Sequence, residues 1–435
     1  MITLRHLPER IRQHLYSKEH RYMTRSALSL AFGLTSTLLL ASASVSAKAP
    51  EKLTFSKAQS DTAIEIVDKL ASRHYRNQAL DDELSSRYLD LYLDTLDPAK
   101  VYFTQADVDE FSKYRTRFDD FLKAGKLKVS FDIFQRYLDR ITARQNSILA
   151  ILEDKDTQFN FIREESLPID LDAATWPTDQ AAADELWRKR LKSNVLSLKL
   201  AGKTTDEARE TLIKRYRNQL NRVGQQDSAD AFEVVINSLT LLYDPHTNYL
   251  SPRTLANFNI NMSLSLEGIG AVLQTEDEFT KVVRLIAAGP ADKAGELQPA
   301  DRIIAVGQGS DGEMTDVVGW RLDEVVKLIR GPKNTQVRLD ILPAGGGADA
   351  ISRQIKINRA KVKLEEQAAK KAVFELGNGE NVYKLGVIDV PAFYIDFEAY
   401  RKRDPNFKST TRDVARLLNE LKQENVDGVI LDLRN

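Results

Sequence analysis

Cysteine and histidine, two residue types common in catalytic and metal sites, are absent or scarce in this sequence. The chain has no cysteine, which excludes disulfides, thiol nucleophiles and cysteine-bound zinc. The five histidines are His6, His14, His20, His74 and His246. The first three lie in an N-terminal leader, so two distant histidines remain for a metal site or a Ser-His-Asp triad. We expect no metal and no cofactor, with His74 on a buried helix face and His246 in a turn.

The last ten residues suggest that the chemistry lies outside this sequence. Residues 426–435 form an apolar run after a helical pattern, which is typical of a buried parallel strand. Such a strand needs helices on its faces and further strands beside it. Loops at the carboxyl ends of parallel strands hold the ligand sites of open α/β enzymes. We therefore expect any catalytic residues to follow Asn435, in a longer protein of which this chain is the front part.

The composition is that of ordinary soluble globular domains. A length of 435 residues is enough for about two to four domains. Hydrophobic residues make up 42% and charged residues 29% of the chain. The formal net charge is −1 and the basic residues are dispersed, so we expect no nucleic-acid partner.

The N-terminus has the pattern of an export signal. Residues 27–41 are apolar, Arg21 and Arg25 precede them, and the small residues 45–47 form a cleavage site. We predict a signal peptide over residues 1–47, with Met23 as an alternative start. An uncleaved membrane anchor is the other interpretation, although the apolar stretch is short for a membrane span. Export predicts a periplasmic protein, with association at the inner membrane left open.

Residues 48–250 are predicted to form a helical domain. Apolar residues recur at helical spacing along most of this region, and we interpret its aromatic residues as core. The later helical patterns cover residues 182–200, 205–222 and 232–242. Pro245 disfavours helical geometry at Asp244, so the last helix should end there.

The pattern changes to strands and glycine turns near residue 262. We predict a compact β domain over residues 255–345, with strands at 281–287, 302–306 and 335–342. Its one good helix spans residues 320–330 and ends at Gly331-Pro332. In isolation, Gly268-Ile269-Gly270 fits a plain hairpin turn.

Residues 346–435 contain a strand at 384–390, a helix at 410–423 and the terminal strand. Strand, helix, strand is the start of a βαβ arrangement. We predict a multidomain α+β fold: a helical domain, a small β domain and the first part of an α/β core.

Several segments together resemble known domains. Residues 289–306, 266–271 and 328–335 resemble the most recognisable stretches of a PDZ domain, and residues 428–435 resemble the strand before the nucleophile in C-terminal processing peptidases. With the leader and the helical front, the whole chain resembles the tail-specific proteases of this family. One departure is Ala300, where PDZ domains usually have glycine; alanine is costly there if the turn requires a positive φ.

The PDZ resemblance implies a binding site for the C-terminus of a protein. The tail would add to the sheet as a strand, with its free carboxylate held by backbone N–H groups. The glycines would let the tail approach the main chain, and Leu266 and Ile269 would line a pocket for its last apolar side chain. The implied site residues are Leu266, Glu267, Gly268, Ile269, Gly270 and Ala271 in the loop, with Val325, Leu328 and Ile329 on the helix.

The family resemblance also implies an activity for the whole protein. Members use a Ser-Lys dyad, in which serine attacks the peptide carbonyl and a lysine kept neutral by desolvation accepts its proton. The resemblance implies a periplasmic serine endopeptidase for apolar C-terminal tails, with a lipoprotein adaptor as a further expected partner. Both dyad residues are expected beyond Asn435, so these 435 residues should bind tails without cleaving them. The alternative is a non-catalytic tail-binding scaffold or adaptor of the cell envelope.

Overall fold

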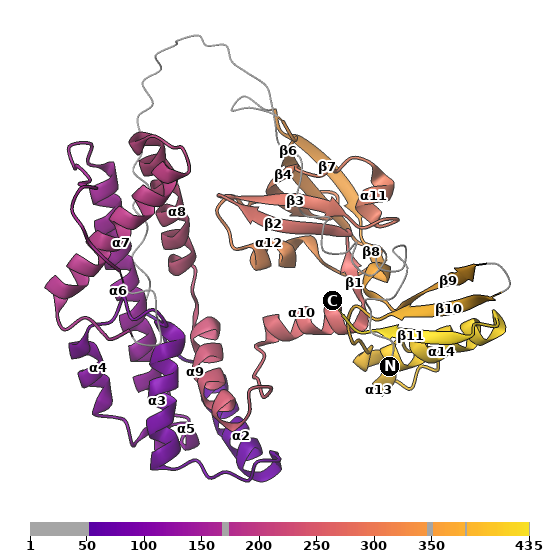
Figure 1. Ribbon diagram of the computed structural model, residues 1–435, viewed down its shortest axis with the longest axis horizontal. Helices are drawn as coiled ribbons and strands as arrows, with labels where there is room; N and C mark the ends of the chain where they lie inside the picture. Colours follow the sequence, from indigo (N-terminus) through magenta and orange to yellow (C-terminus); the bar gives the residue numbers. More distant parts are fainter. Residues whose placement is uncertain (1–51, 168–173, 346–350, 379–380, 435) are drawn as a thin grey trace.

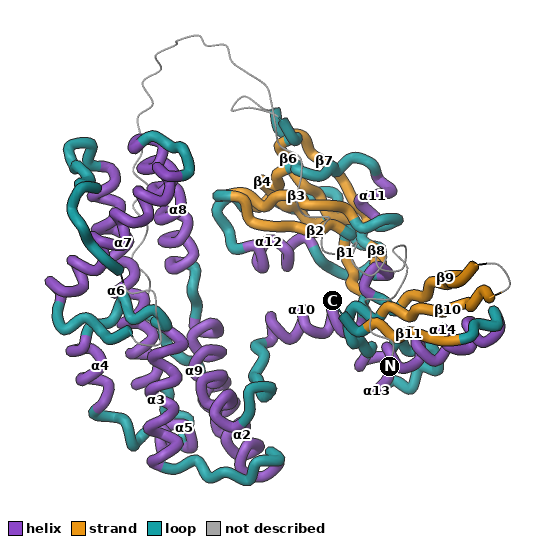
Figure 2. Tube along the Cα trace, in the orientation of Figure 1, coloured by secondary structure: helices purple, strands orange, loops and turns teal. Residues whose placement is uncertain are grey.

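The computed structural model describes residues 52–167, 174–345, 351–378 and 381–434. The predicted signal peptide, residues 1–47, lies outside the described residues. Helices fill the first half of the described chain, and strands and helices mix in the second half (Figures 1 and 2). The predicted multidomain α+β fold class is confirmed.

The first domain packs its helices around two apolar cores. One core joins α2, α3, α5, the first half of α6 and α9, and the other joins the end of α6 to α7 and α8. The helix α9 ends at Tyr243 before Asp244-Pro245, as predicted. The helices are α2 (Lys57–Arg73), α3 (Asp82–Leu96), α4 (Gln105–Ser112), α5 (Phe118–Lys123), α6 (Lys128–Glu153), α7 (Gln180–Leu200), α8 (Thr205–Gly224) and α9 (Ser228–Tyr243).

A helix that the sequence analysis missed, α10 (Pro252–Ser263), leads from the first domain to the strands. Ser251 caps its N-terminus by accepting from the Thr254 N–H, and Pro252 occupies the first turn. None of its residues is buried in a core.

The second domain is a sheet with the strand order β2-β3-β4-β6-β7, and β5 also pairs with β4. The alternation predicted for residues 335–342 is confirmed, because Val337, Leu339 and Ile341 are fully buried. The sheet also includes β7, so it continues past residue 345, where the sequence analysis placed the end of this domain. The elements are β2 (Ala271–Glu276), β3 (Phe279–Leu285), α11 (Pro290–Ala294), β4 (Arg302–Gln308), β5 (Met314–Asp316), α12 (Leu322–Ile329), β6 (Gln336–Leu342) and β7 (Arg353–Asn358).

Below this sheet, a two-stranded ribbon leads to a third unit. In the third unit, β10 pairs in parallel with β11 and antiparallel with β9, and α14 connects the parallel strands, as the βαβ prediction requires. The elements are β1 (Ser265–Gly268), β8 (Ala360–Lys363), a 3-10 turn at Glu365–Gln367, β9 (Lys370–Asn378), β10 (Asn381–Asp389), α13 (Phe397–Arg401), α14 (Thr410–Gln423) and β11 (Gly428–Asp432).

The expectation that the terminal strand is buried is wrong for one of its faces. Val429 and Leu431 are 45% and 50% exposed, whereas Gly428, Ile430 and Asp432 are half-buried. Alternate side chains of a strand point to opposite faces of the sheet, so Val429 and Leu431 share the more open face.

The two histidines among the described residues have different environments. His74 follows the last residue of α2 and is half-buried, with Nε2 3.0 Å from the Thr247 hydroxyl. The expectation that it lies on a buried helix face is therefore wrong. His246 lies in a turn with its side chain 90% exposed and Nδ1 3.2 Å from Asp244. Among the described residues, no helix is long and apolar enough to cross a membrane, and no group of three acidic or histidine side chains is placed to hold a metal ion.

Candidate functional site

The candidate site is the edge of the second domain where β2 faces α12. The strand β2 is at one end of the sheet, and α12 packs beside it (Figure 1). The Gly270 C=O accepts from the Ile286 N–H at 2.8 Å, so the main-chain N–H and C=O groups of the even-numbered residues of β2 point toward β3. Ala271, Leu273 and Thr275 therefore direct their main-chain groups away from β3. This edge can accept one more strand.

The loop before β2 points two N–H groups toward the same edge. Its geometry follows from the carbonyls, because C=O and the next N–H of a planar trans peptide point in opposite directions. The Ile269 C=O accepts from the Ala291 N–H at 2.8 Å, which directs the Gly270 N–H away from α11. The Gly270 C=O accepts from Ile286, the residue after β3, which directs the Ala271 N–H away from β3. Two adjacent N–H groups of this kind can bind a carboxylate.

The loop needs glycine at one position more than at the other. Gly270 has φ +75°, and a Cβ there would lie 3.3 Å from the Gly289 Cα and from Val362 Cγ2. Gly268 has no positive φ, and its nearest neighbour would be the mobile Leu266 Cδ1 at 3.1 Å. A side chain is therefore strained at Gly270 and tolerable at Gly268.

Burial divides the residues predicted for this site. Ile269, Val325 and Ile329 are only 3%, 0% and 3% exposed and belong to the core of the domain, and their direct contact with a tail stays a prediction. They support the loop and the helix from behind. Leu266, Ala271 and Leu328 are half-buried, and Glu267 is exposed and accepts from the Lys333 N–H at 3.1 Å.

The helix α12 has one apolar stripe in the core and further apolar residues on its flanks. Leu322, Val326 and Leu328 are half-buried, and Leu328 packs against the core of the domain. Helical periodicity identified the buried stripe but not the flank that faces β2.

Arg330, which the sequence analysis did not single out, lies at the loop. Its Cγ is 3.7 Å from the position that a Cβ on Gly268 would occupy. Burial lowers the pKa of its guanidinium, and among the described residues its guanidinium pairs with no carboxylate. Its Nη1 donates to Asn257 Oδ1 on α10 at 2.8 Å. A cation in this position favours a negatively charged ligand end.

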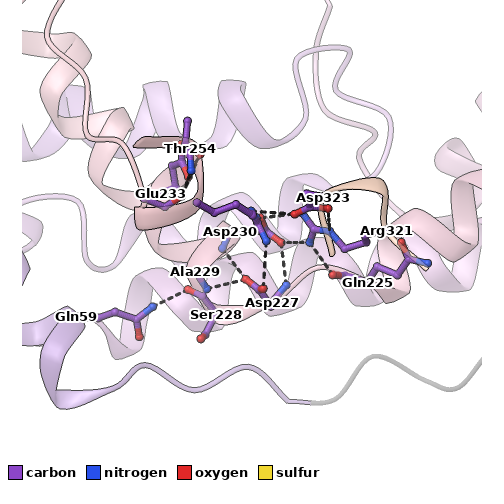
Figure 3. Close-up of polar contacts among 12 residues, drawn as sticks. Gln59, Gln225, Asp227, Ser228, Ala229, Asp230, Glu233, Thr254, Arg321 and Asp323 are labelled. Carbon is purple, nitrogen blue, oxygen red and sulfur yellow. Dashed lines mark hydrogen bonds and ion pairs between the residues drawn. The ribbon is translucent and has the colours of Figure 1, made fainter. Parts of the chain in front are cut away.

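An ion-pair cluster connects the start of α12 to the helical domain. It consists of Asp230 on α9, Arg253 on α10, and Arg321 and Asp323 at the start of α12 (Figure 3). Arg253 and Arg321 both pair with Asp230, and Arg253 Nε is 2.9 Å from Asp323. Arg321 also donates to the Gln225 C=O at 2.8 Å.

The arginines keep Asp230 ionised. Burial alone would raise the pKa of Asp230, but the hydrogen bond and charge of Arg321 and the charge of Arg253 outweigh it, so the pKa lies below its usual value. The same pairing raises the pKa of Arg321 against the effect of burial. The cluster is therefore charged at neutral pH and joins the peptide-binding domain to the helices before it.

Two family descriptions match the two larger domains. Residues 257–342 match the PDZ domain, and residues 66–253 match the family described as the tail specific protease N-terminal domain. The edge strand and the loop described above thus belong to a PDZ domain, a class of peptide-binding domain.

Relatives extend this likeness over most of the chain. A tail-specific protease from Haemophilus influenzae is 39% identical over 84% of this chain and 49% of its own length. The carboxy-terminal processing protease CtpA of Bacillus subtilis is 29% identical over 56% of this chain and 45% of its own. A solved PDZ domain of a carboxy-terminal protease from Vibrio cholerae, in complex with a peptide, is 52% identical; the match covers 23% of this chain and 100% of that chain, with a TM-score of 0.22.

The chain contains the N-terminal domain of tail-specific proteases followed by a PDZ domain, and it is similar to a tail-specific protease over 84% of its length. It spans about half the length of the curated relatives that it matches, 49% for the Haemophilus protein and 45% for the Bacillus protein.

Ala300 lies in the turn for which the sequence did not show whether a positive φ is required. It has φ +72°, so the turn does require the left-handed region at the position where PDZ domains usually have glycine. An alanine in this region costs about 1–2 kcal/mol. The domain keeps this turn although the residue is strained.

Proposed function

We propose that this chain binds the C-terminal tails of proteins and that the longer protein containing it is a periplasmic serine endopeptidase that degrades or processes them. The observation that carries the first part is the pair of N–H groups of Gly270 and Ala271, directed to the free edge of β2. A tail carboxylate would bind these N–H groups, and the tail would pair with the odd-numbered residues of β2.

The apolar preference rests on the walls of the groove. Leu273 and Ala271 on β2 and Leu322, Val326 and Leu328 on α12 are half-buried apolar side chains without full cover. An apolar side chain at the tail end would remove this surface from water. Arg330 would add a charge-assisted interaction with the carboxylate.

The binding part is tested with one peptide in two forms. A fluorescent decapeptide ending in Ala-Ala is titrated with the chain, once with a free carboxylate and once amidated. The free carboxylate should bind at least about tenfold more tightly, because amidation removes a charged hydrogen-bond acceptor. Equal affinities of the two forms would refute the carboxylate-binding loop.

The proteolytic part rests on the family and on the names of its relatives, which are proteases. We place the nucleophilic serine and its lysine beyond Asn435, so the present chain should not cleave a tagged substrate. Cleavage of such a substrate by this chain alone would contradict that placement. Export to the periplasm is tested by fusing residues 1–47 to a reporter enzyme that is active only outside the cytoplasm.

A further inference from the structure

A polar cleft lies where the helical domain meets the PDZ domain. It has a volume of about 360 Å³ and is lined from both sides. The helical domain contributes the end of α8 and the residues after it, and the PDZ domain contributes the β2–β3 turn and the start of α12. Its main lining residues are Asn218, Arg222, Gln225, Thr275, Trp320 and Leu322.

The cleft lies at the open end of the tail groove. Arg330, just after α12, is beside Gly268 at the carboxylate loop, whereas Leu322 at the start of α12 lines the cleft together with Thr275 on β2. The helix α12 therefore runs antiparallel to β2. A tail with its carboxylate at Gly270 also runs antiparallel to β2, so its upstream residues must leave the groove past Thr275.

The length of β2 sets which tail residues reach the cleft. From Ala271 to Thr275 the strand advances four residues, which is about 14 Å at about 3.4 Å per residue. A paired tail advances at the same rate. Its last four or five residues therefore occupy the groove, and the residues before them enter the cleft.

The two sides of the cleft are held together by polar contacts. Gln225 donates from its side chain to the Gly319 C=O at 2.6 Å, and Lys214 pairs with Asp277 of the β2–β3 turn at 2.6 Å. The ion-pair cluster around Asp230 fixes the start of α12 next to them (Figure 3). The cleft is thus formed before a tail arrives, which lowers the entropic cost of using it.

The chemistry of the cleft differs from that of the groove. Side-chain amides and Arg222 offer hydrogen bonds, the carboxylates of Asp277, Glu278 and Asp323 also line the cleft, and Trp320 is 43% exposed and offers an aromatic face. These groups suit an extended polar main chain with polar side chains better than an aliphatic segment.

We propose that this cleft is a second subsite for protein tails, which binds polar residues about five to eight positions before the free carboxylate. The helical domain thereby contacts part of the tail that the PDZ domain alone does not reach. This inference rests on the proposed tail binding, and it predicts that affinity depends on tail length as well as on the last residues.

The test compares two free-carboxylate peptides that share their last four residues, a tetrapeptide and a decapeptide with polar upstream residues. We expect the decapeptide to bind the chain about tenfold more tightly. Trp320→Ala and Arg222→Ala should each remove most of this advantage and leave the tetrapeptide affinity within about twofold. Arg87→Ala, on an exposed position of α3, is the matched control and should change neither affinity.

Each outcome has a definite meaning. Equal affinities of the two peptides, or an advantage that survives both cleft variants, would overturn the second subsite and leave tail binding intact. Failure of both peptides to bind the unmodified chain would overturn the proposed tail binding and the subsite with it.

Discussion

Substituting Gly270 and Gly268 separately tests the carboxylate loop, because the two glycines differ in backbone conformation and in what a side chain would meet. At Gly270 an alanine must adopt φ +75° and place its Cβ 3.3 Å from the Gly289 Cα, a backbone atom that cannot rotate away. At Gly268 the alanine Cβ meets Leu266 Cδ1 at 3.1 Å, the far end of a flexible side chain.

The expected magnitudes follow from these contacts. The left-handed region costs alanine about 1–2 kcal/mol, and an unrelieved close contact adds about 1 kcal/mol or more. If the loop relaxes to relieve this strain, the N–H groups of Gly270 and Ala271 turn away from a tail carboxylate. Gly270→Ala should then weaken tail binding about 10- to 100-fold, whereas Gly268→Ala should weaken it less than about threefold.

The measurement is fluorescence anisotropy with the free-carboxylate decapeptide, and the amidated peptide serves as the control for carboxylate recognition. Thermal unfolding of each variant separates loss of binding from loss of folding at the assay temperature. If the two variants bind equally well, or if Gly268→Ala is the more damaging of the two, the assignment of the loop geometry is wrong.

Three further substitutions address the strained turn, the ion-pair cluster and the loop cation. Ala300→Gly should stabilise the PDZ domain by about 0.5–1 kcal/mol, because the strain removed at φ +72° exceeds the backbone entropy that glycine loses on folding. Ala294→Gly in α11 is the control and should destabilise the domain. Denaturant unfolding measures the sign of both changes. Asp230→Asn should cost about 2–4 kcal/mol in calorimetric unfolding, with the exposed Asp94→Asn within about 0.5 kcal/mol as its control. The folded-state pKa of Asp230 is lowered, so its contribution to the free energy of unfolding is present above its unfolded pKa of about 3.9. This contribution is lost as the pH falls through the folded-state pKa. The stability difference between Asp230→Asn and the unmodified chain should therefore be constant from about pH 5 to 8 and shrink below about pH 4. Arg330→Gln should weaken the free-carboxylate peptide about three- to tenfold and leave the amidated peptide unchanged in the same anisotropy assay; an equal effect on both peptides would exclude a role for its charge.

Local hydrophobic patterns predicted the helices and strands that bury one face in a core. They did not predict the contacts between elements. The helix α14 spans Thr410–Gln423, as its apolar spacing predicted, because Leu417 and Leu421 fill one core. The helix α10 was missed, and none of its residues is buried in a core. The stripe of Val325 and Ile329 is apolar and buried, and its contact with a ligand stays a prediction, since spacing alone does not separate a core from a groove.

The site also depends on contacts between residues far apart in sequence. Asp230 and Arg321 are separated by 91 positions, and neither belongs to a motif that would pair them. Arg330 has no acidic neighbour in sequence that marks it as functional, and its importance follows from its approach to Gly268. The resemblance identified the carboxylate loop, whereas the second side of the cleft requires the three-dimensional arrangement of both domains.

The second subsite implies that a long tail and the contact between the two domains stabilise each other. The last four residues of either peptide bind the PDZ domain in both arrangements, whereas the upstream residues of the decapeptide contact α8 only while the domains are joined. A tenfold preference for the decapeptide therefore corresponds to about 1.4 kcal/mol by which it stabilises the joined arrangement. Hydrogen exchange at the end of α8, around Asn218 and Arg222, should slow with saturating decapeptide and not with saturating tetrapeptide. If both peptides slow exchange there equally, the protection arises within the PDZ domain and the helical domain does not read the tail.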